Sequence, residues 1–382
     1  MNNFIFQNPT KILFGKGMTS KIARLVPEKA KVLLLYGGGS AKRNGAFEQA
    51  IQALGKRKIV EFGGIEPNPE YATCMKAVKL IKEKKLDFIL ALGGGSVIDA
   101  CKFISAAVNY KGKDPWDILE NDLEVKDALP FGTILTLPAT GSEMNMNSVV
   151  SRREIGKKIS FASPSVFPQF SVLDPLFTTT LPARQTRNGV IDAFVHVMEQ
   201  YLTYPADAPL QDRFAESIAI TLIENGPKAL KKPDDITARA NIMLSATMAL
   251  NHLIGIGVPQ DWSSHLIGHE LTALYGLDHA ETLAIALPKV MQYKRKSKGD
   301  KIVQLGKRVF GITEKSKVKA VDKTIEAVKK FFKKMGAGVE LSDYKLPSDA
   351  PAQVAKNFAR TYDAVGENAD ITPSDVEKIL KI

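Results

Sequence analysis

The chain has 382 residues, of which 45% are apolar and 24% charged. This composition is typical of a soluble globular protein, and the length predicts two domains rather than one core. The formal net charge is +11, and the only cysteines are Cys74 and Cys101. No disulfide framework is expected from two cysteines, so a reducing cytoplasm is the simplest setting.

No segment of the sequence predicts export or membrane insertion. The first residues, MNNFIFQNPTKILFGKG, lack the basic and apolar regions of a signal peptide. The stretch 241–260 carries no charge, but polar side chains such as Asn241, Asn251 and His252 make it a poor lipid-facing span. We therefore expect a helix buried inside the protein, with His252 packed in the core.

The positive charge is concentrated in one stretch. Residues 294–334 hold 15 Lys/Arg and 4 Asp/Glu, which accounts for the whole excess. Within that stretch, apolar side chains recur as on one face of a helix: Val318, Val321, Ile325, Val328 and Phe332. The lysines then fall on the solvated face, so this pattern does not favour nucleic acid as a partner.

The first half of the chain alternates strand-like and helix-like segments. KVLLLYGGGS (31–40) and DFILALGGGS (87–96) predict buried strands that run into glycine turns, and residues 70–85 between them have helical spacing. FGTILTLPATGSE (131–143) predicts a third strand with a small-residue turn. Strands that alternate with helices indicate an α/β fold with a parallel sheet.

After Pro182 the periodicity becomes helical to the end of the chain. GVIDAFVHVMEQYL (189–202) and DRFAESIAITLIENG (212–226) are examples. We therefore predict an α/β domain over residues 1–181 and an all-helical domain over residues 182–382.

The glycine turns can approach a nucleotide closely. Three glycines after a buried strand suit a pyrophosphate, although neither turn matches G-x-G-x-x-G, because the third glycine position is Lys42 in one and Ile98 in the other. A tight turn without a ligand is the alternative. The first turn has no acid for an adenosine ribose and is followed by Lys42 and Arg43, which favours NADP, unless both cations are simply solvated.

Three of the five histidines lie in HLIGHELTALYGLDH (265–279). His265 and His269 stand four apart and share a helix face, as do Asp192 and His196 on another predicted helix. Together with His279 they predict a metal site, although any one pair could be a coincidence on the surface or in the core. Spacing alone does not decide whether His265, His269 or both would bind the ion.

Four segments carry a resemblance to a known family: GGGSVIDACK (93–102), TLPATGSE (136–143), GVIDAFVHVMEQ (189–200) and VPQDWSSHLIGHELTALYGLDHAETLAIALP (258–288). They resemble the iron-containing (group III) alcohol dehydrogenase family, in particular its NADPH-dependent aldehyde reductase and butanol dehydrogenase branch. The resemblance runs nearly end to end. The long histidine segment is specific, whereas GGGS alone is not.

The resemblance implies a Rossmann-like dinucleotide-binding domain, a helical metal-binding domain and an active site in the cleft between them. It implies one catalytic divalent metal, iron or zinc, held by Asp192, His196, His265 and His279. His269 would lie near the substrate and the nicotinamide and relay a proton. The implied cofactor contacts are Gly37, Gly38, Ser40, Asn68, Gly94, Gly95, Ser96, Asp99, Thr136, Thr140, Asn147 and Lys158.

The expected function is that of a metal-dependent NADP(H) alcohol dehydrogenase or aldehyde reductase. Hydride would pass between NADPH and a short-to-medium-chain aldehyde that the metal polarises. The resemblance also implies a homodimer. The alternative is an NAD and metal enzyme of the dehydroquinate-synthase-like or glycerol-dehydrogenase-like kind.

Overall fold

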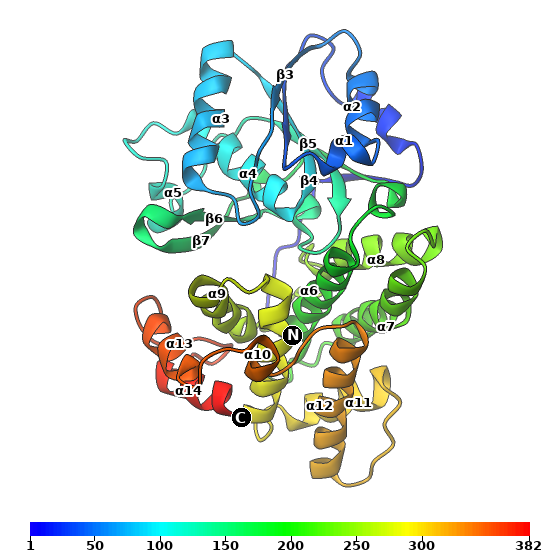
Figure 1. The fold of residues 1–382 in the computed structure, drawn as a ribbon, viewed down its shortest axis with the longest axis vertical. Helices are drawn as coiled ribbons and strands as arrows, with labels where there is room; N and C mark the ends of the chain where they lie inside the picture. The colour runs from blue at the N-terminus through cyan, green and yellow to red at the C-terminus, as the bar shows by residue number, and fades with distance from the viewer. The chain divides into compact units, whose positions relative to one another are not determined.

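The computed structural model describes residues 1–382 (Figure 1). The strands are β1 Lys11–Phe14, β2 Lys31–Tyr36, β3 Lys58–Phe62, β4 Phe88–Gly94, β5 Phe131–Leu137, β6 Asn147–Arg152, β7 Lys157–Ala162 and β8 Phe170–Leu173. The α-helices are α1 Ser40–Arg43, α2 Ala46–Leu54, α3 Tyr71–Lys84, α4 Gly95–Asn109, α5 Asp117–Glu120, α6 Ala183–Tyr201, α7 Pro209–Lys231, α8 Ile236–Ala249, α9 Ser263–Tyr275, α10 His279–Tyr293, α11 Gly299–Val309, α12 Lys317–Lys334, α13 Ala350–Phe358 and α14 Pro373–Lys381. Short 3-10 segments are η1 Met18–Arg24, η2 Ser142–Met144, η3 Arg153–Ile155, η4 Pro164–Val166, η5 Pro175–Thr178 and η6 Leu341–Tyr344.

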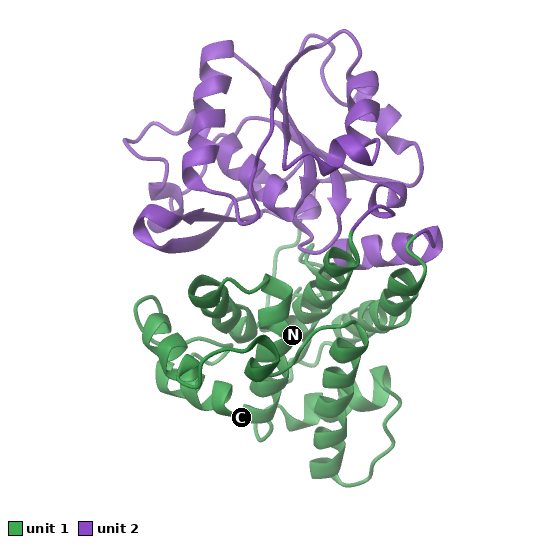
Figure 2. Cartoon of the chain, viewed as in Figure 1, with its two compact units in different colours: residues 1–6, 182–233, 248–382 green, residues 7–181, 234–247 purple.

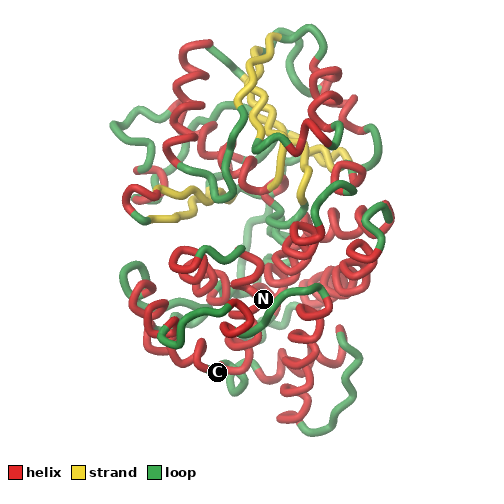
Figure 3. The backbone as a smooth tube through the Cα atoms, viewed as in Figure 1, coloured by secondary structure: helices red, strands yellow, loops and turns green.

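The chain forms two compact units (Figure 2). Unit 1 comprises Met1–Phe6, Pro182–Pro233 and Met248–Ile382, and unit 2 comprises Gln7–Leu181 and Asp234–Thr247. All eight strands lie in unit 2, whereas the regular structure of unit 1 is helical (Figure 3). Most of α8 therefore groups with the strands, although it lies far along the sequence from them.

Unit 2 is built on a six-stranded sheet in the order β1-β8-β5-β4-β2-β3, with every neighbouring pair parallel. This confirms the predicted α/β fold with a parallel sheet. The chain moves from β2 outward to β3 and then returns to place β4 on the other side of β2, so the strand order reverses between β2 and β4. In open α/β sheets, ligands bind at the carboxyl ends of the strands at such a reversal.

Both faces of the sheet are buried, as expected for parallel strands covered by helices. Along β2, Leu33 and Leu35 pack in one core with α3 and α4, and Val32 and Leu34 pack in the other with α2 and η1. The antiparallel hairpin of β6 and β7 is a second sheet, which no pattern in the sequence predicted.

In unit 1, every residue of α6 from Gly189 to Tyr201 is buried. A second core joins α9, α10, α13 and α14 through side chains such as Ile267, Ile285, Val354 and Ile379. A helix buried on all sides is ordinarily apolar, so the polar residues of α6 are its informative feature.

Two sequence predictions need correction. The helix expected over 241–260 ends at Ala249, and the rest consists of turns, in which half-buried His252 has a φ of 72°. On α12 the predicted apolar face is buried except for Val318, which is 63% exposed in the first turn of the helix. None of the helices is both long enough and apolar enough to cross a bilayer.

Candidate functional site

Three ionisable side chains follow one face of the buried helix α6. Asp192, His196 and Glu199 stand four and three residues apart, so they project from successive turns of the same face. Their side chains are exposed by only 6%, 5% and 3%. Since buried charges are costly unless they are paired or bind a metal, this face requires partners from other helices.

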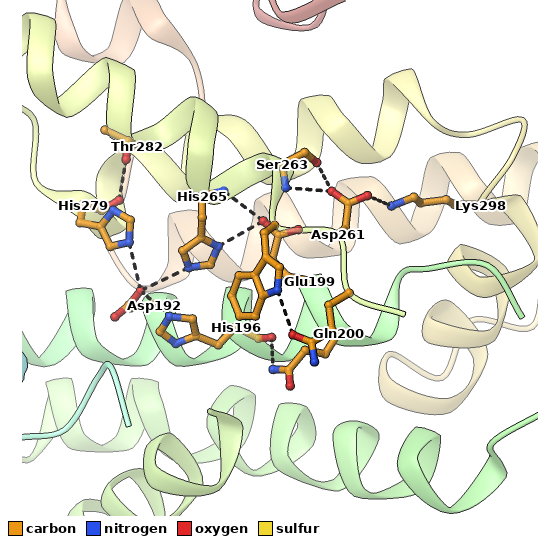
Figure 4. Close-up of polar contacts among 12 residues, drawn as sticks. Asp192, His196, Glu199, Gln200, Asp261, Ser263, His265, His279, Thr282 and Lys298 are labelled. Atoms are coloured by element: carbon orange, nitrogen blue, oxygen red, sulfur yellow. Dashed lines mark hydrogen bonds and ion pairs between the residues drawn. The ribbon is translucent and has the colours of Figure 1, made fainter. Parts of the chain in front are cut away.

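Histidine side chains from three helices surround one carboxylate oxygen (Figure 4). The Nε2 atoms of His196 on α6, His265 on α9 and His279 on α10 lie 3.6, 4.0 and 3.7 Å from Oδ1 of Asp192. Asp192, His265 and His279 each bring one possible ligand atom within 4.8 Å of the others. The rings of His196 and His265 are stacked with centroids 4.8 Å apart.

This arrangement fits a divalent transition metal. Bonds of about 2.1 Å in a tetrahedral site place neighbouring ligand atoms about 3.4 Å apart, close to the 3.6, 4.0 and 3.7 Å that separate the three Nε2 atoms from Asp192 Oδ1. Three imidazole nitrogens and one carboxylate oxygen also form a donor set suited to zinc or iron. The structure therefore brings the four predicted metal residues together, in a geometry that an ion could occupy with small adjustments.

His269, the predicted proton relay, lies next to this cluster. It is one turn after His265 on α9, and its ring centroid is 5.2 Å from that of His279. His269 is half-buried, whereas His265 is buried. Trp262, just before α9, has a φ of 64° that is unusual for a bulky residue, and its ring lies edge-on to His265 at 5.2 Å.

A network of buried charges lies behind His265. Oε1 of Glu199 accepts a hydrogen bond from the His265 main-chain N–H at 3.0 Å and lies 3.1 Å from Nδ1 of the same residue. Burial, with a further contribution from the charge of Asp261, raises the pKa of Glu199 to about 8. Lys298 is in contact with Asp261 and lies 2.9 Å from Glu367.

The groups of this network shift the pKa values of Asp261 and Glu367 in opposite directions. Burial opposes the ionisation of Asp261, but a hydrogen bond with Glu367 and the charge of Lys298 outweigh it, and the pKa of Asp261 falls below its usual range. Burial and the neighbouring Asp261 raise the pKa of Glu367 to about 7.

In unit 2 the two glycine turns lie side by side at the carboxyl ends of β2 and β4. The side chain of Val97 lies against both turns. A Cβ atom added to Gly37 would lie 3.5 Å from Cγ2 of Val97, and one added to Gly93 would lie 2.5 Å from the same atom. A Cβ atom on Gly95 would lie 2.4 Å from Oγ1 of Thr140. Glycine at 93 and 95 thus allows close packing of α4 against its neighbours.

Several predicted cofactor residues meet beside these turns. Nζ of Lys158, on β7, donates to Oδ1 of Asn68 at 2.8 Å, and the Asn68 main-chain N–H donates to Oγ of Ser96 at 3.3 Å. Asp99 accepts from Ser142 Oγ at 2.6 Å. Of the remaining predicted residues, Gly37, Gly38 and Ser40 follow β2, Gly94 ends β4, Thr136 is in β5, Thr140 follows it, and Asn147 begins β6 of the hairpin.

Lys102 holds the segment between β5 and β6. Its side chain is fully buried on α4, and its Nζ donates to Ser142 Oγ, Asn145 Oδ1 and the carbonyl oxygen of Asn147, at 2.8, 2.9 and 2.7 Å. Burial lowers the pKa of Lys102 to about 8, against the opposing charges of Asp99 and Glu143.

Sequence reasoning missed Glu199, Lys102 and the Asp261–Lys298–Glu367 group. Glu199 had a usable signal, because it falls seven residues after Asp192 and so on the same helix face. The pairing of Lys298 with Asp261 and Glu367 had none, since these residues come from distant segments.

Comparisons with known proteins identify the family. Residues 9–175 match the family described as iron-containing alcohol dehydrogenase, and residues 186–382 match the C-terminal part of the Fe-containing alcohol dehydrogenase family. The chain belongs to the iron-containing alcohol dehydrogenase family. It is accordingly an oxidoreductase of the alcohol dehydrogenase class, as the resemblance of its motifs predicted.

Individual relatives cover the full length. The NADPH-dependent aldehyde reductase YqhD of Escherichia coli (strain K12) is 54% identical over 97% of both chains. The probable NADH-dependent butanol dehydrogenase 1 of Bacillus subtilis (strain 168) is 40% identical over 100% of this chain and 99% of its own. The crystal structure of E. coli K-12 YqhD matches with a TM-score of 0.97 at 51% identity, covering 100% of this chain and 98% of that chain.

Proposed function

We propose that the chain is a metal-dependent aldehyde reductase and alcohol dehydrogenase that transfers hydride between NADPH and a short-to-medium-chain aldehyde. One observation carries the proposal: three histidine nitrogens gather around Oδ1 of Asp192, in a chain that is 54% identical to an NADPH-dependent aldehyde reductase. The name of that relative motivates the substrate class and the direction of the reaction.

The proposed metal ligands are Asp192, His196, His265 and His279. A divalent metal held there supplies Lewis acidity toward a carbonyl group. Zinc and iron both suit three imidazoles and a carboxylate, and we propose one of these two ions. His269 lies next to His279 without being one of these ligands, which supports its proposed role in moving the proton between solvent and the oxygen of the product.

We propose that the nucleotide binds along the carboxyl ends of β2, β4 and β5, through the glycine turns and the residues around Asn68 and Lys158. Named relatives use either NADPH or NADH, so the family does not determine the choice between them. The first turn carries no acid, which supports NADP. Lys42 and Arg43 are both exposed, but Lys42 pairs with Glu61 at 3.2 Å, so Arg43 is our candidate for the 2′-phosphate.

We further propose that the protein works in the cytoplasm as a homodimer. The absence of a disulfide framework supports the compartment. Exposed apolar side chains at Phe4, Ile5 and Phe6 support association with a second copy, because Ile5 is 100% exposed. Light scattering coupled to gel filtration would test the dimer, and a mass of one chain at micromolar concentration would contradict it.

The reaction is tested by following NADPH and NADH oxidation with butanal. The protein is assayed as purified, after removal of metal, and after zinc or iron is restored. We expect oxidation that depends on metal and is faster with NADPH than with NADH. Fully metallated protein that consumes neither cofactor with several aldehydes would contradict the proposal, and the ion that restores the higher rate identifies the more effective metal.

A further inference from the structure

Glu199 is buried in the wall of the proposed metal centre, but it is not one of the proposed ligands. Its side chain is 3% exposed and reaches from α6 to the first turn of α9. Burying a carboxylate so completely is costly, so its contacts must supply a compensating interaction.

One oxygen of Glu199 contacts His265 at two points. Oε1 accepts the main-chain N–H at 3.0 Å and lies 3.1 Å from ring Nδ1 (Figure 4). Because Oε1 already accepts the main-chain N–H, it acts as an acceptor toward the ring as well, and this contact places the ring proton on Nδ1. Nε2 of His265 then keeps its lone pair, and Nε2 is the atom that lies 4.0 Å from Oδ1 of Asp192.

The surrounding contacts fix the main chain of Glu199 against the turn that precedes α9. The Asp261 main-chain N–H donates to the Glu199 carbonyl oxygen at 2.9 Å, and Oδ1 of Asp261 accepts from the Ser263 N–H at 2.9 Å. The turn before α9 is thereby tied to α6 at Glu199. Lys298 contacts Asp261 in turn, so the network behind His265 is continuous.

A purely structural role is the competing explanation. The residue at the N-cap of α9, Trp262, makes no side-chain capping bond, and Glu199 satisfies the N–H of His265 from another helix. A cap of this kind would stabilise α9 whether or not a metal binds. The contact with Nδ1 distinguishes the two roles, because capping α9 does not require it.

We propose that Glu199 is a positioning residue of the metal centre, whose carboxylate fixes the ring orientation and tautomer of His265 and strengthens its Nε2 as a metal donor. Carboxylates that hold the second nitrogen of a metal-bound histidine act in this way, and their loss typically weakens metal binding about 10–100-fold. The inference rests on the proposed metal centre but not on the proposed substrate.

The test is a zinc titration of metal-free protein in competition with a chelating dye, which needs no turnover. In Glu199→Gln the amide oxygen can still cap α9, but the side chain can no longer carry a negative charge beside Nδ1. Glu216→Gln is the matched control, since Glu216 is a buried carboxylate of unit 1 whose partners are Tyr201, Gln304 and Arg308. Thermal unfolding of the metal-free proteins reports the capping role separately.

We expect Glu199→Gln to bind zinc about tenfold more weakly than the wild type or weaker still, with the control unchanged. A smaller loss, or a loss that the control shares, would overturn the proposal and leave Glu199 as a helix cap. If the wild type binds no zinc or iron, the metal centre itself fails, which is a different result from a variant that matches the wild type.

Should Glu199→Gln not fold, nitrogen NMR of the histidine rings in zinc-loaded wild-type protein decides the question. We expect Nδ1 of His265 to be protonated and Nε2 to carry the metal shift. Metal on Nδ1, or an unprotonated Nδ1, would overturn the proposal.

Discussion

Nε2 of His279 lies 3.7 Å from Oδ1 of Asp192, although the two side chains come from different helices, α10 and α6. His279 is the first residue of α10, and Asp278 before it and Glu281 after it form a capping box that fixes this helix start. Arg187 of α6 donates to Glu281 at 2.6 Å, which ties the start of α10 to the helix that carries Asp192. The position of His279 is therefore set by local capping as well as by packing.

Removing His279 should empty the proposed metal centre. We expect His279→Ala to lose more metal affinity than the roughly 10–100-fold that an outer-shell change costs, and to lose turnover with it, because one of four ligands is gone. Metal content after dialysis and the zinc affinity of the dialysed protein are the measurements. A fully metallated, active variant would remove His279 from the site.

His269 should behave differently from His279. If His269 only moves a proton, His269→Ala lowers kcat by about 100-fold or more while metal content stays near that of the wild type. The two histidine variants, assayed side by side for metal and rate, control for each other. Loss of metal from His269→Ala would show that the residue is a ligand and that its proposed role is wrong.

An acid in the first glycine turn should reverse the cofactor preference. Gly38 is suited to the test, because a Cβ atom there has nothing within 4 Å and the residue has no positive φ. We expect Gly38→Asp to weaken NADPH binding by about tenfold or more through repulsion of the 2′-phosphate, with NADH binding equal or tighter. Fluorescence titration of both cofactors measures this, and an equal loss for both would count against the placement of the 2′-phosphate.

Lys102 should make stability depend on pH in an alkaline window. Its pKa is about 8 in the folded protein, against 10.5 for an ordinary lysine, so between these values the unfolded chain holds a proton that the folded protein has lost. The free energy of unfolding contributed by this group therefore rises with pH, by about 1 kcal/mol per pH unit within that window. Denaturant unfolding of the wild type and of Lys102→Met from pH 8 to 10 gives the difference, and a difference that does not change with pH would contradict the assignment.

Elements that leave a local pattern of apolar or ionisable residues in the sequence could be predicted from it. Apolar runs ending in glycine gave β2 and β4 because a strand buried on both faces has no polar alternation. The pair Asp192 and His196 was recognisable because a helix places residues four apart on one face. The structure brings the predicted metal residues together, while their role as ligands stays a proposal.

Other features depend on contacts that sequence spacing does not carry. Lys298 contacts Asp261 and Glu367 only through tertiary packing, so no local sequence pattern predicted a buried charge network. The helix expected over 241–260 was wrong beyond Ala249, because an uncharged stretch is compatible with buried turns as well as with a helix. The β6–β7 hairpin, which carries Asn147 and Lys158, was not recognised as a pair of strands because its sequence is rich in polar and basic residues.

The central claim is hydride transfer from NADPH to an aldehyde with the help of the metal. NADPH deuterated at the transferring position of the nicotinamide is incubated with butanal and either metallated or metal-free protein, and the product is analysed by mass spectrometry. We predict deuterium on the carbinol carbon of butanol with metallated protein and little product without metal. Product that lacks the label, or equal labelled product from the metal-free protein, would contradict the account.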